Sequence, residues 1–237
     1  MNWQLIVDFD GTISLKDTTD LLLNKFADPA WHAIEAEWHA GTIGSRECMM
    51  RQIDLVRATP AQMDAFVDNI EIDWHFKSFV RQAQRYNLPV TIASDGLDYI
   101  IHSVMRRAGL ENLTVNSNHL SYKGDGQWRL SSPFASNSCH SQSGTCKCAI
   151  ATQRHDKMTL VIGDGRSDRC VAQDADFVFA KSGLIQFCEE KQLPFMAFRD
   201  FAHASQLLSN LLEIVPALGE NATTSIKSAP LKETIYG

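Results

Sequence analysis

Two aspartates follow an apolar segment at the start of the chain, in the sequence DFDGT at residues 8–12. The preceding residues 3–7 predict a strand buried on both faces, which places Asp8 and Asp10 at its carboxyl end. Two buried carboxylates this close together are costly unless a positive charge lies between them. In an open parallel sheet, ligands bind at that edge. The pair is therefore a candidate nucleophile and proton donor that share a cation.

Two more polar segments follow predicted strands further along the chain. Residues 88–93 are an apolar strand followed by Ser94-Asp95-Gly96, and residues 158–162 are another, followed by GDGRSD at residues 163–168. Because the carboxyl ends of parallel strands meet at one edge of a sheet, we expect all three segments to converge there.

A lysine is needed to balance so many carboxylates. Lys147 opens a predicted helix just before the third strand, and Lys157 is the alternative.

The converging groups suit phosphoryl transfer. Mg²⁺ prefers carboxylate and water ligands and commonly takes its remaining ligands from substrate phosphate. In the predicted mechanism, Asp8 attacks phosphorus, and Asp10 protonates the leaving alkoxide and then activates water. Asp8, Asp164 and the backbone carbonyl of Asp10 are the expected ligands of Mg²⁺, and Asp168 is expected to orient them. The predicted phosphate-binding residues are Thr12, Ser94, Asp95, Gly96 and Lys147.

Four parts of the sequence resemble, in this order, the motifs of the haloacid dehalogenase-like phosphatases: residues 8–12, Ser94, Lys147 and residues 163–168. The resemblance spans residues 3–213, and the helical stretch between the first two motifs resembles the small C1-type cap of this family. It implies a phosphoric monoester hydrolase that uses Mg²⁺, forms an aspartyl-phosphate intermediate and acts on a small phosphorylated metabolite.

A closer resemblance concerns the cysteine-rich residues 139–148, which lead into Lys147. This segment is similar to the methionine-salvage branch that acts on 2-hydroxy-3-keto-5-methylthiopentenyl-1-phosphate, and the cap type resembles the phosphoserine phosphatase branch. Ser94-Asp95-Gly96 and an additional C-terminal tail depart from the methionine-salvage pattern. Phosphoserine and sugar or polyol phosphates therefore stay open as substrates.

The elements that must position these residues alternate between strands and helices. This alternation predicts an α/β fold, a doubly wound (Rossmann-like) parallel sheet with an inserted helical cap and a small β-hairpin at residues 113–130. The helical residues 17–86 far exceed the roughly dozen residues that a simple crossover needs. We predict a core domain of residues 1–14 and 80–218, a cap of residues 15–79 and a flexible tail of residues 219–237.

Within the predicted cap, the sequence indicates where two helices begin and which side chains are buried or charged. Ser45 is a candidate N-cap and Pro60 a candidate first-turn residue. Trp31 and Trp38 are expected in the cap core, and the charged residues Arg46, Glu47 and Arg51 form either a solvated helix face or contacts to polar groups of a substrate.

Six cysteines are present, and three of them, Cys48, Cys170 and Cys188, are expected to be small buried hydrophobic residues. Three interpretations stay open for Cys139, His140, Cys146 and Cys148: a zinc site, a disulfide or reduced thiols near the active site. The zinc site and the reduced thiols also leave open a protein of another class, a non-catalytic metal-binding or redox-sensing module.

Composition excludes several classes of protein. With 44% hydrophobic and 21% charged residues, the 237-residue chain can bury a core, which argues against global disorder. The net charge of −6 and the absence of a basic tract argue against nucleic acid as a partner. No apolar run is long enough to span a membrane and no signal-like segment opens the chain, so we expect no membrane partner and a cytoplasmic location. The sequence does not predict an oligomeric state.

Overall fold

A computed structural model of the chain describes residues 2–154 and 156–217, with side chains as far as Glu213. Its centre is a seven-stranded sheet with the strand order β4-β3-β2-β1-β5-β6-β7. Neighbouring strands are parallel except for the antiparallel pair β3 and β4. The strands are β1 (Trp3–Val7), β2 (Val90–Leu97), β3 (Thr114–Gly124), β4 (Gln127–Ser131), β5 (Met158–Gly163), β6 (Phe177–Ala180) and β7 (Phe195–Ala197).

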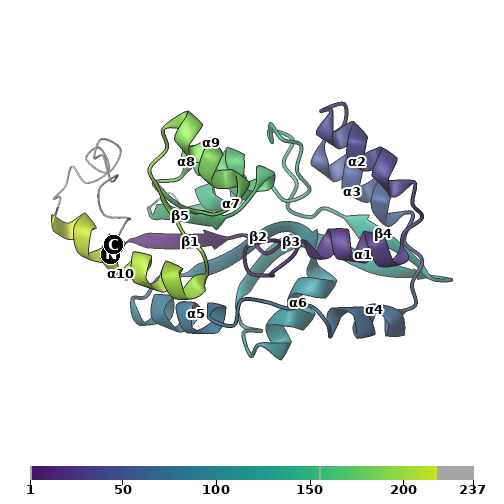
Figure 1. Ribbon diagram of the computed structural model, residues 1–237, viewed down its shortest axis with the longest axis horizontal. Helices are drawn as coiled ribbons and strands as arrows, with labels where there is room; N and C mark the ends of the chain where they lie inside the picture. Colours follow the sequence, from purple (N-terminus) through teal and green to yellow (C-terminus); the bar gives the residue numbers. More distant parts are fainter. Residues whose placement is uncertain (1, 155, 218–237) are drawn as a thin grey trace.

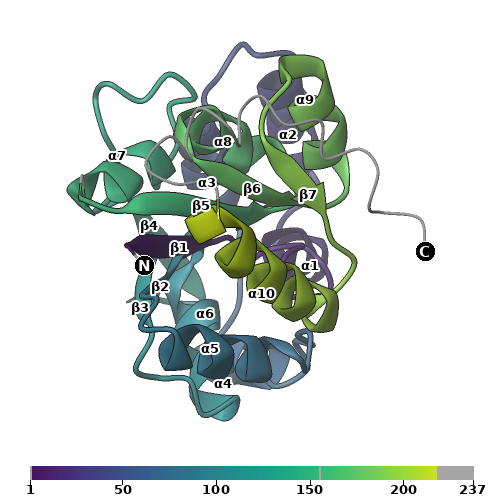
Figure 2. The ribbon, with the colours of Figure 1, turned by 90° about the vertical axis from the view of Figure 1, so that its left-hand side faces the viewer.

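Helices cover both faces of the sheet. Helices α5, α6 and α10 lie on one face, and α7, α8 and α9 lie on the other (Figures 1 and 2). Helices α1, α2 and α3 gather beyond the carboxyl ends of the strands (Figure 1). The predicted doubly wound α/β fold is confirmed. The helices are α1 (Thr18–Phe26), α2 (Trp31–His39), α3 (Ser45–Ile53), α4 (Pro60–Val67), α5 (Phe76–Arg85), α6 (Asp98–Arg107), α7 (Lys147–Ala151), α8 (Arg169–Asp174), α9 (Gly183–Lys191) and α10 (Phe201–Ala217), with short 3₁₀ turns at Thr152–Arg154 and Arg166–Asp168.

Strand β1 is buried on both faces, as its sequence predicts. Leu5 and Val7 belong to the hydrophobic core on the side of α5 and α10, whereas Ile6 belongs to a second core with Val161 and Val178. Since successive side chains of a strand point to opposite faces, one apolar run holds both helical layers to the sheet. This burial fixes the position of the two aspartates that follow.

The predicted hairpin is present, but it is part of the main sheet rather than a separate unit. Strand β3 pairs in parallel with β2 and carries β4 at the edge. The indole N–H of Trp128 donates to the carbonyl of Ala58 at 2.8 Å, and the Ala58 amide donates to the carbonyl of Gly126 at 2.9 Å. The hairpin therefore holds the segment that joins α3 to α4.

Two predictions about the cap helices have opposite outcomes. Pro60 begins α4 as predicted, and Thr59 and Gln62 form a capping box around it. The prediction for Ser45 is wrong, because Gly44 occupies the N-cap position of α3. The Ser45 hydroxyl instead donates to Asp95, a contact with the core.

Helix α5 packs against α10 on the core. The Gln82 side chain donates to the Ser205 carbonyl and to the Ser209 hydroxyl, both at 2.9 Å. The predicted boundary between residues 79 and 80 falls inside this helix, and the division into domains stays a prediction. The predicted tail, residues 219–237, lies outside the described residues. None of the helices within residues 2–154 and 156–217 is both long and apolar enough to cross a lipid bilayer.

Candidate active site

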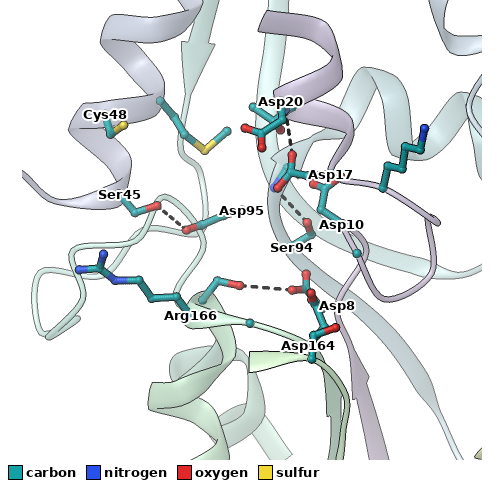
Figure 3. A pocket seen from close by; sticks show the side chains of 18 of the residues that line it. Asp8, Asp10, Asp17, Asp20, Ser45, Cys48, Ser94, Asp95, Asp164 and Arg166 are labelled. Carbon is teal, nitrogen blue, oxygen red and sulfur yellow. Dashed lines mark hydrogen bonds between the residues drawn. The ribbon is translucent and has the colours of Figure 1, made fainter. Parts of the chain in front are cut away.

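The three polar segments converge at the carboxyl edge of the sheet. Val7 of β1 is in register with Ile92 of β2 on one side and with Ile162 of β5 on the other. The residues that follow these positions therefore share one end of the sheet. Strand β2 continues to Leu97 instead of ending at residue 93, because an irregularity in its pairing with β3 accommodates residues 94–96. Figure 3 shows the resulting cluster.

A buried ion pair joins the first and third segments. Lys147 Nζ lies 2.8 Å from Asp8 Oδ2 and 2.7 Å from Asp168 Oδ1. Burial opposes the charged form of Lys147, but the carboxylates of Asp168 and Asp8 outweigh it and raise its pKa. Burial and the charge of Asp168 raise the pKa of Asp8, and Lys147 opposes that shift. The competing residue, Lys157, precedes β5 and lies at the opposite edge of the sheet.

A group of three carboxylates could hold a metal ion here. Among the described residues, only Asp8, Asp164 and Asp168 form a cluster whose ligand atoms all lie within 4.8 Å of one another. Asp168 Oδ2 also accepts the backbone N–H groups of Asp164 and Gly165, at 3.1 and 3.2 Å. Burial and the charge of Asp168 raise the pKa of Asp164 to about 6. A cation would relieve this repulsion.

Asp10 lies in a different environment from Asp8. Its Oδ1 accepts the Thr18 backbone N–H at 2.7 Å and the Thr18 hydroxyl at 2.6 Å. Burial and the nearby Asp17 carboxylate raise the pKa of Asp10 to about 7, although the bonds from Thr18 oppose this. A pKa near neutrality suits a group that both donates and accepts a proton.

The predicted phosphate-binding residues come together at this edge. The Thr12 hydroxyl donates to Asp164 Oδ1 at 3.1 Å, and the Gly96 amide donates to the Ser94 hydroxyl at 2.9 Å. Asp95 uses its side chain for contacts with Ser45 and with the backbone before Lys147. Their predicted roles toward phosphate stay predictions.

A cavity of about 470 Å³ opens above these residues. One face of α3 forms part of its wall, and further carboxylates and cations come from α1, α2 and the core loops. The lining residues outside the predicted motifs include Asp17, Asp20, Glu35, Trp38, Ser45, Cys48, Met49, Gln52 and Lys181.

Sequence reasoning missed this wall. Ser45, Cys48, Met49 and Gln52 recur at the spacing of one helix face, which is the signal that could have identified them. Arg51, on another face of α3, instead forms two hydrogen bonds with Glu37 of α2, at 2.7 and 2.8 Å.

The prediction that Trp38 belongs to the cap core is also wrong. The indole is partly exposed at the cavity rim, where the Arg166 guanidinium lies 4.6 Å from its ring centre. Trp31, by contrast, is buried as predicted.

The cysteines of the cysteine-rich segment, Cys139, Cys146 and Cys148, are free thiols in this structure. The other three cysteines are free thiols as well. Cys139, His140, Cys146 and Cys148 do not form a metal-binding cluster among the described residues. Cys48 and Cys188 are buried as predicted, whereas Cys170 is half-buried.

This fold and this arrangement of carboxylates at the edge of the sheet characterise one large class of hydrolases. The sequence model of the haloacid dehalogenase-like hydrolases matches residues 5–173 of the chain. The chain therefore belongs to this family of enzymes, and the membership that its four motifs predict is confirmed.

Two relatives cover nearly the whole chain. The 2-hydroxy-3-keto-5-methylthiopentenyl-1-phosphate phosphatase of Brevibacillus brevis is 29% identical over 217 residues, which are 89% of this chain and 97% of the relative. Pdp3-interacting factor 1 of Schizosaccharomyces pombe is 28% identical over 214 residues, 86% of this chain and 93% of the relative.

Solved structures of phosphoserine phosphatases share the fold. The enzyme from T. onnurineus has a TM-score of 0.66 at 12% identity, over 89% of this chain and 96% of that chain. A phospho-aspartyl intermediate analogue of phosphoserine phosphatase has a TM-score of 0.64 at 16% identity, over 90% and 99%.

Proposed function

We propose that this enzyme hydrolyses a small phosphate monoester through a phosphorylated Asp8 and requires Mg²⁺. The observation that carries the proposal is the buried Asp8 carboxylate, whose Oδ2 lies 2.8 Å from Lys147 Nζ at the carboxyl edge of the sheet. A carboxylate can act as a nucleophile toward phosphorus when positive charge is close enough to reduce its repulsion from the phosphate.

The donor set fits a divalent cation. Asp8, Asp164 and Asp168 offer hard oxygen ligands, which Mg²⁺ prefers. Asp168 is already occupied by Lys147 and two backbone amides, so we propose Asp8, Asp164 and the backbone carbonyl of Asp10 as ligands and Asp168 as the residue that orients them. Bound Mg²⁺ would supply charge neutralisation between the anionic nucleophile and the phosphate.

The remaining chemistry belongs to side chains. Asp8 displaces the alkoxide, and protonated Asp10 gives it a proton as the ester bond breaks. Asp10, now ionised, then takes a proton from the water that attacks the phospho-Asp8 and releases inorganic phosphate. Lys147 and Ser94 hold the phosphoryl oxygens during both steps. Helix α3 limits the access of bulk water to the cavity.

The relatives and the cavity wall together favour one substrate. We propose 2-hydroxy-3-keto-5-methylthiopentenyl-1-phosphate, the substrate named for the Brevibacillus brevis relative. Cys48 and Met49 offer soft contacts for a thioether tail. Asp17, Asp20 and Glu35, from the α1 and α2 region, line the same cavity and would repel the carboxylate of phosphoserine while attracting its ammonium group, so the proposed preference rests on the contacts to the thioether tail.

The test is the release of inorganic phosphate from a panel of substrates. The panel contains the methylthiopentenyl phosphate, O-phosphoserine, a polyol phosphate and p-nitrophenyl phosphate, each with Mg²⁺ and with a chelator. We expect activity that the chelator abolishes and Mg²⁺ restores, with the largest kcat/KM for the methylthiopentenyl phosphate. Absence of metal-dependent release from every compound would refute the proposal.

A further inference from the structure

Asp95 contacts three segments that are far apart in the sequence, two through its carboxylate and one through its backbone carbonyl. Its Oδ2 accepts the Ser45 hydroxyl of α3 at 2.8 Å, a contact drawn in Figure 3. Its Oδ1 accepts the Thr145 backbone N–H at 2.7 Å. Its backbone carbonyl accepts the side-chain amide of Asn118, from β3, at 2.6 Å. Both oxygens of this carboxylate are therefore used within the protein.

Asn118 gives the same helix a second contact. This side chain is fully buried, and its amide nitrogen lies 3.7 Å from the sulfur of Met49, while its oxygen accepts the Ser132 hydroxyl at 2.7 Å. Ser45 and Met49 are four residues apart and so lie on one face of α3. That face, with Cys48 and Gln52, lines the cavity.

The contact of Asp95 with Thr145 leads along the chain to Lys147, the lysine that we propose holds the substrate phosphate. Thr145 is two residues before Lys147, whose Nζ contacts Asp8. The loop before it packs tightly against its neighbours: a Cβ on Gly144 would collide with Asn118, and one on Gly44 would lie 2.5 Å from the Cβ of Gln142. The Arg46 amide also donates to the Gln142 carbonyl at 3.0 Å.

We propose that Asp95 is a positioning residue that couples α3 to Lys147, an inference that rests on the function proposed above. Its carboxylate holds the cavity face of α3 through Ser45 and the segment that leads to Lys147 through Thr145. One residue thereby positions both the α3 side chains that contact the substrate tail and the Lys147 ammonium group that holds the substrate phosphate. Loss of the bond to Ser45 should alter only the position of α3. Loss of the bonds to both Ser45 and Thr145 should also weaken phosphate binding by Lys147.

Three substitutions separate these two effects. Ser45→Ala removes only the bond to α3, Ser45→Thr keeps the hydroxyl, and Asp95→Ala removes both bonds. The readouts are kcat and KM for p-nitrophenyl phosphate and the inhibition constant of inorganic phosphate, all with Mg²⁺. We expect Ser45→Ala to lower kcat/KM about tenfold, the equivalent of one lost hydrogen bond, and to leave phosphate inhibition unchanged. Asp95→Ala should lower kcat/KM and also weaken phosphate inhibition about tenfold.

Ser78→Ala is the matched control, because Ser78 is an exposed residue of α5 whose hydroxyl donates to the nearby His75 carbonyl. It should match the wild type in every readout, and Ser45→Thr should recover most of the activity that Ser45→Ala loses. Wild-type constants in Ser45→Ala and Asp95→Ala would overturn the inference, and so would equal changes in phosphate inhibition for the two. If Asp95→Ala does not fold, the comparison of Ser45→Ala with Ser45→Thr decides. A wild type that hydrolyses nothing overturns the proposed function itself.

Discussion

The two aspartates of the first motif differ in their surroundings more than in their position. Asp8 faces Lys147, whereas Asp10 faces the hydroxyl and amide of Thr18. Burial and Asp17 raise the pKa of Asp10 to about 7, which suits a group that must give and take a proton near neutral pH. The division of labour that we propose for them thus rests on the neighbours that each carboxylate meets in the folded chain.

Replacement of Asp17 tests this account of Asp10. The negative charge of Asp17 raises the pKa of Asp10, so Asp17→Asn should lower that pKa. Since the proposed mechanism requires a protonated Asp10 to assist the leaving alkoxide, the alkaline limb of the kcat profile should move to lower pH. The measurement is kcat against pH with an alkyl phosphate. Asp28→Asn, an exposed aspartate that accepts the Ala30 amide, is the control and should not shift the limb. An unchanged limb in Asp17→Asn would contradict the account.

Gly96 tests how closely the second motif approaches Asp10. A Cβ at this position would collide with Asp10 Oδ2 and lie 3.1 Å from the Ser94 hydroxyl. We expect Gly96→Ala to displace both side chains and to lower kcat/KM by about 100-fold, since small displacements of reacting groups have effects of this size. Gly183→Ala is the control, because its Cβ would meet only the Asp164 carbonyl, at 3.9 Å. Full activity in Gly96→Ala would show that Asp10 does not depend on this contact.

At the residue scale, sequence alone could predict the groups that meet but not their partners. Asp8 and Asp164 follow strands, Ser94 lies in the carboxyl-terminal part of β2 and Lys147 opens a helix, so topology brings them together. The role of Trp38 could not be predicted, because an aromatic residue at helical spacing has the same pattern in a core as at a cavity rim.

At the scale of elements, the hairpin shows where local pattern stops being informative. Polar alternation predicts that β3 and β4 pair with each other, which they do. It contains no information on the further pairing of β3 with β2, which depends on the exposed edge of the folded sheet. This added pairing brings Asn118 beside Asp95.

The hairpin should contribute to stability through Trp128. Its indole N–H donates to the buried carbonyl of Ala58, so Trp128→Phe leaves that carbonyl without its partner. We expect a loss of about 1–3 kcal/mol in the free energy of unfolding, measured by denaturant titration. Trp74→Phe is the control, because Trp74 is 79% exposed and its replacement should change stability by less than about 0.5 kcal/mol. Equal stability of both variants would refute the role of the hairpin.

At the scale of the whole molecule, one edge of the sheet concentrates negative charge that the fold alone does not neutralise. We expect Mg²⁺ to raise the melting temperature, because a ligand that binds only the folded state stabilises it. Burial and Asp168 raise the pKa of Asp164 to about 6, so protons compete with the metal as the pH falls through that value. The stabilisation should therefore be large near pH 8 and small near pH 5. Thermal unfolding with and without Mg²⁺ checks this, and a shift independent of pH would contradict it.

The central claim is that Asp8 carries the phosphoryl group. Asp10→Asn keeps the oxygen that accepts from Thr18 but removes the proton acceptor needed to activate water. With p-nitrophenyl phosphate, whose leaving group needs little protonation, the first step should proceed and the second should stall. The decisive measurement is mass spectrometry of this variant, quenched in acid after incubation with the substrate and Mg²⁺. We predict one added phosphoryl group on the peptide that contains Asp8, and none when Asp8→Asn is combined with it. A phosphoryl group on another residue, or turnover at the wild-type rate with no phosphorylated protein, would contradict the account.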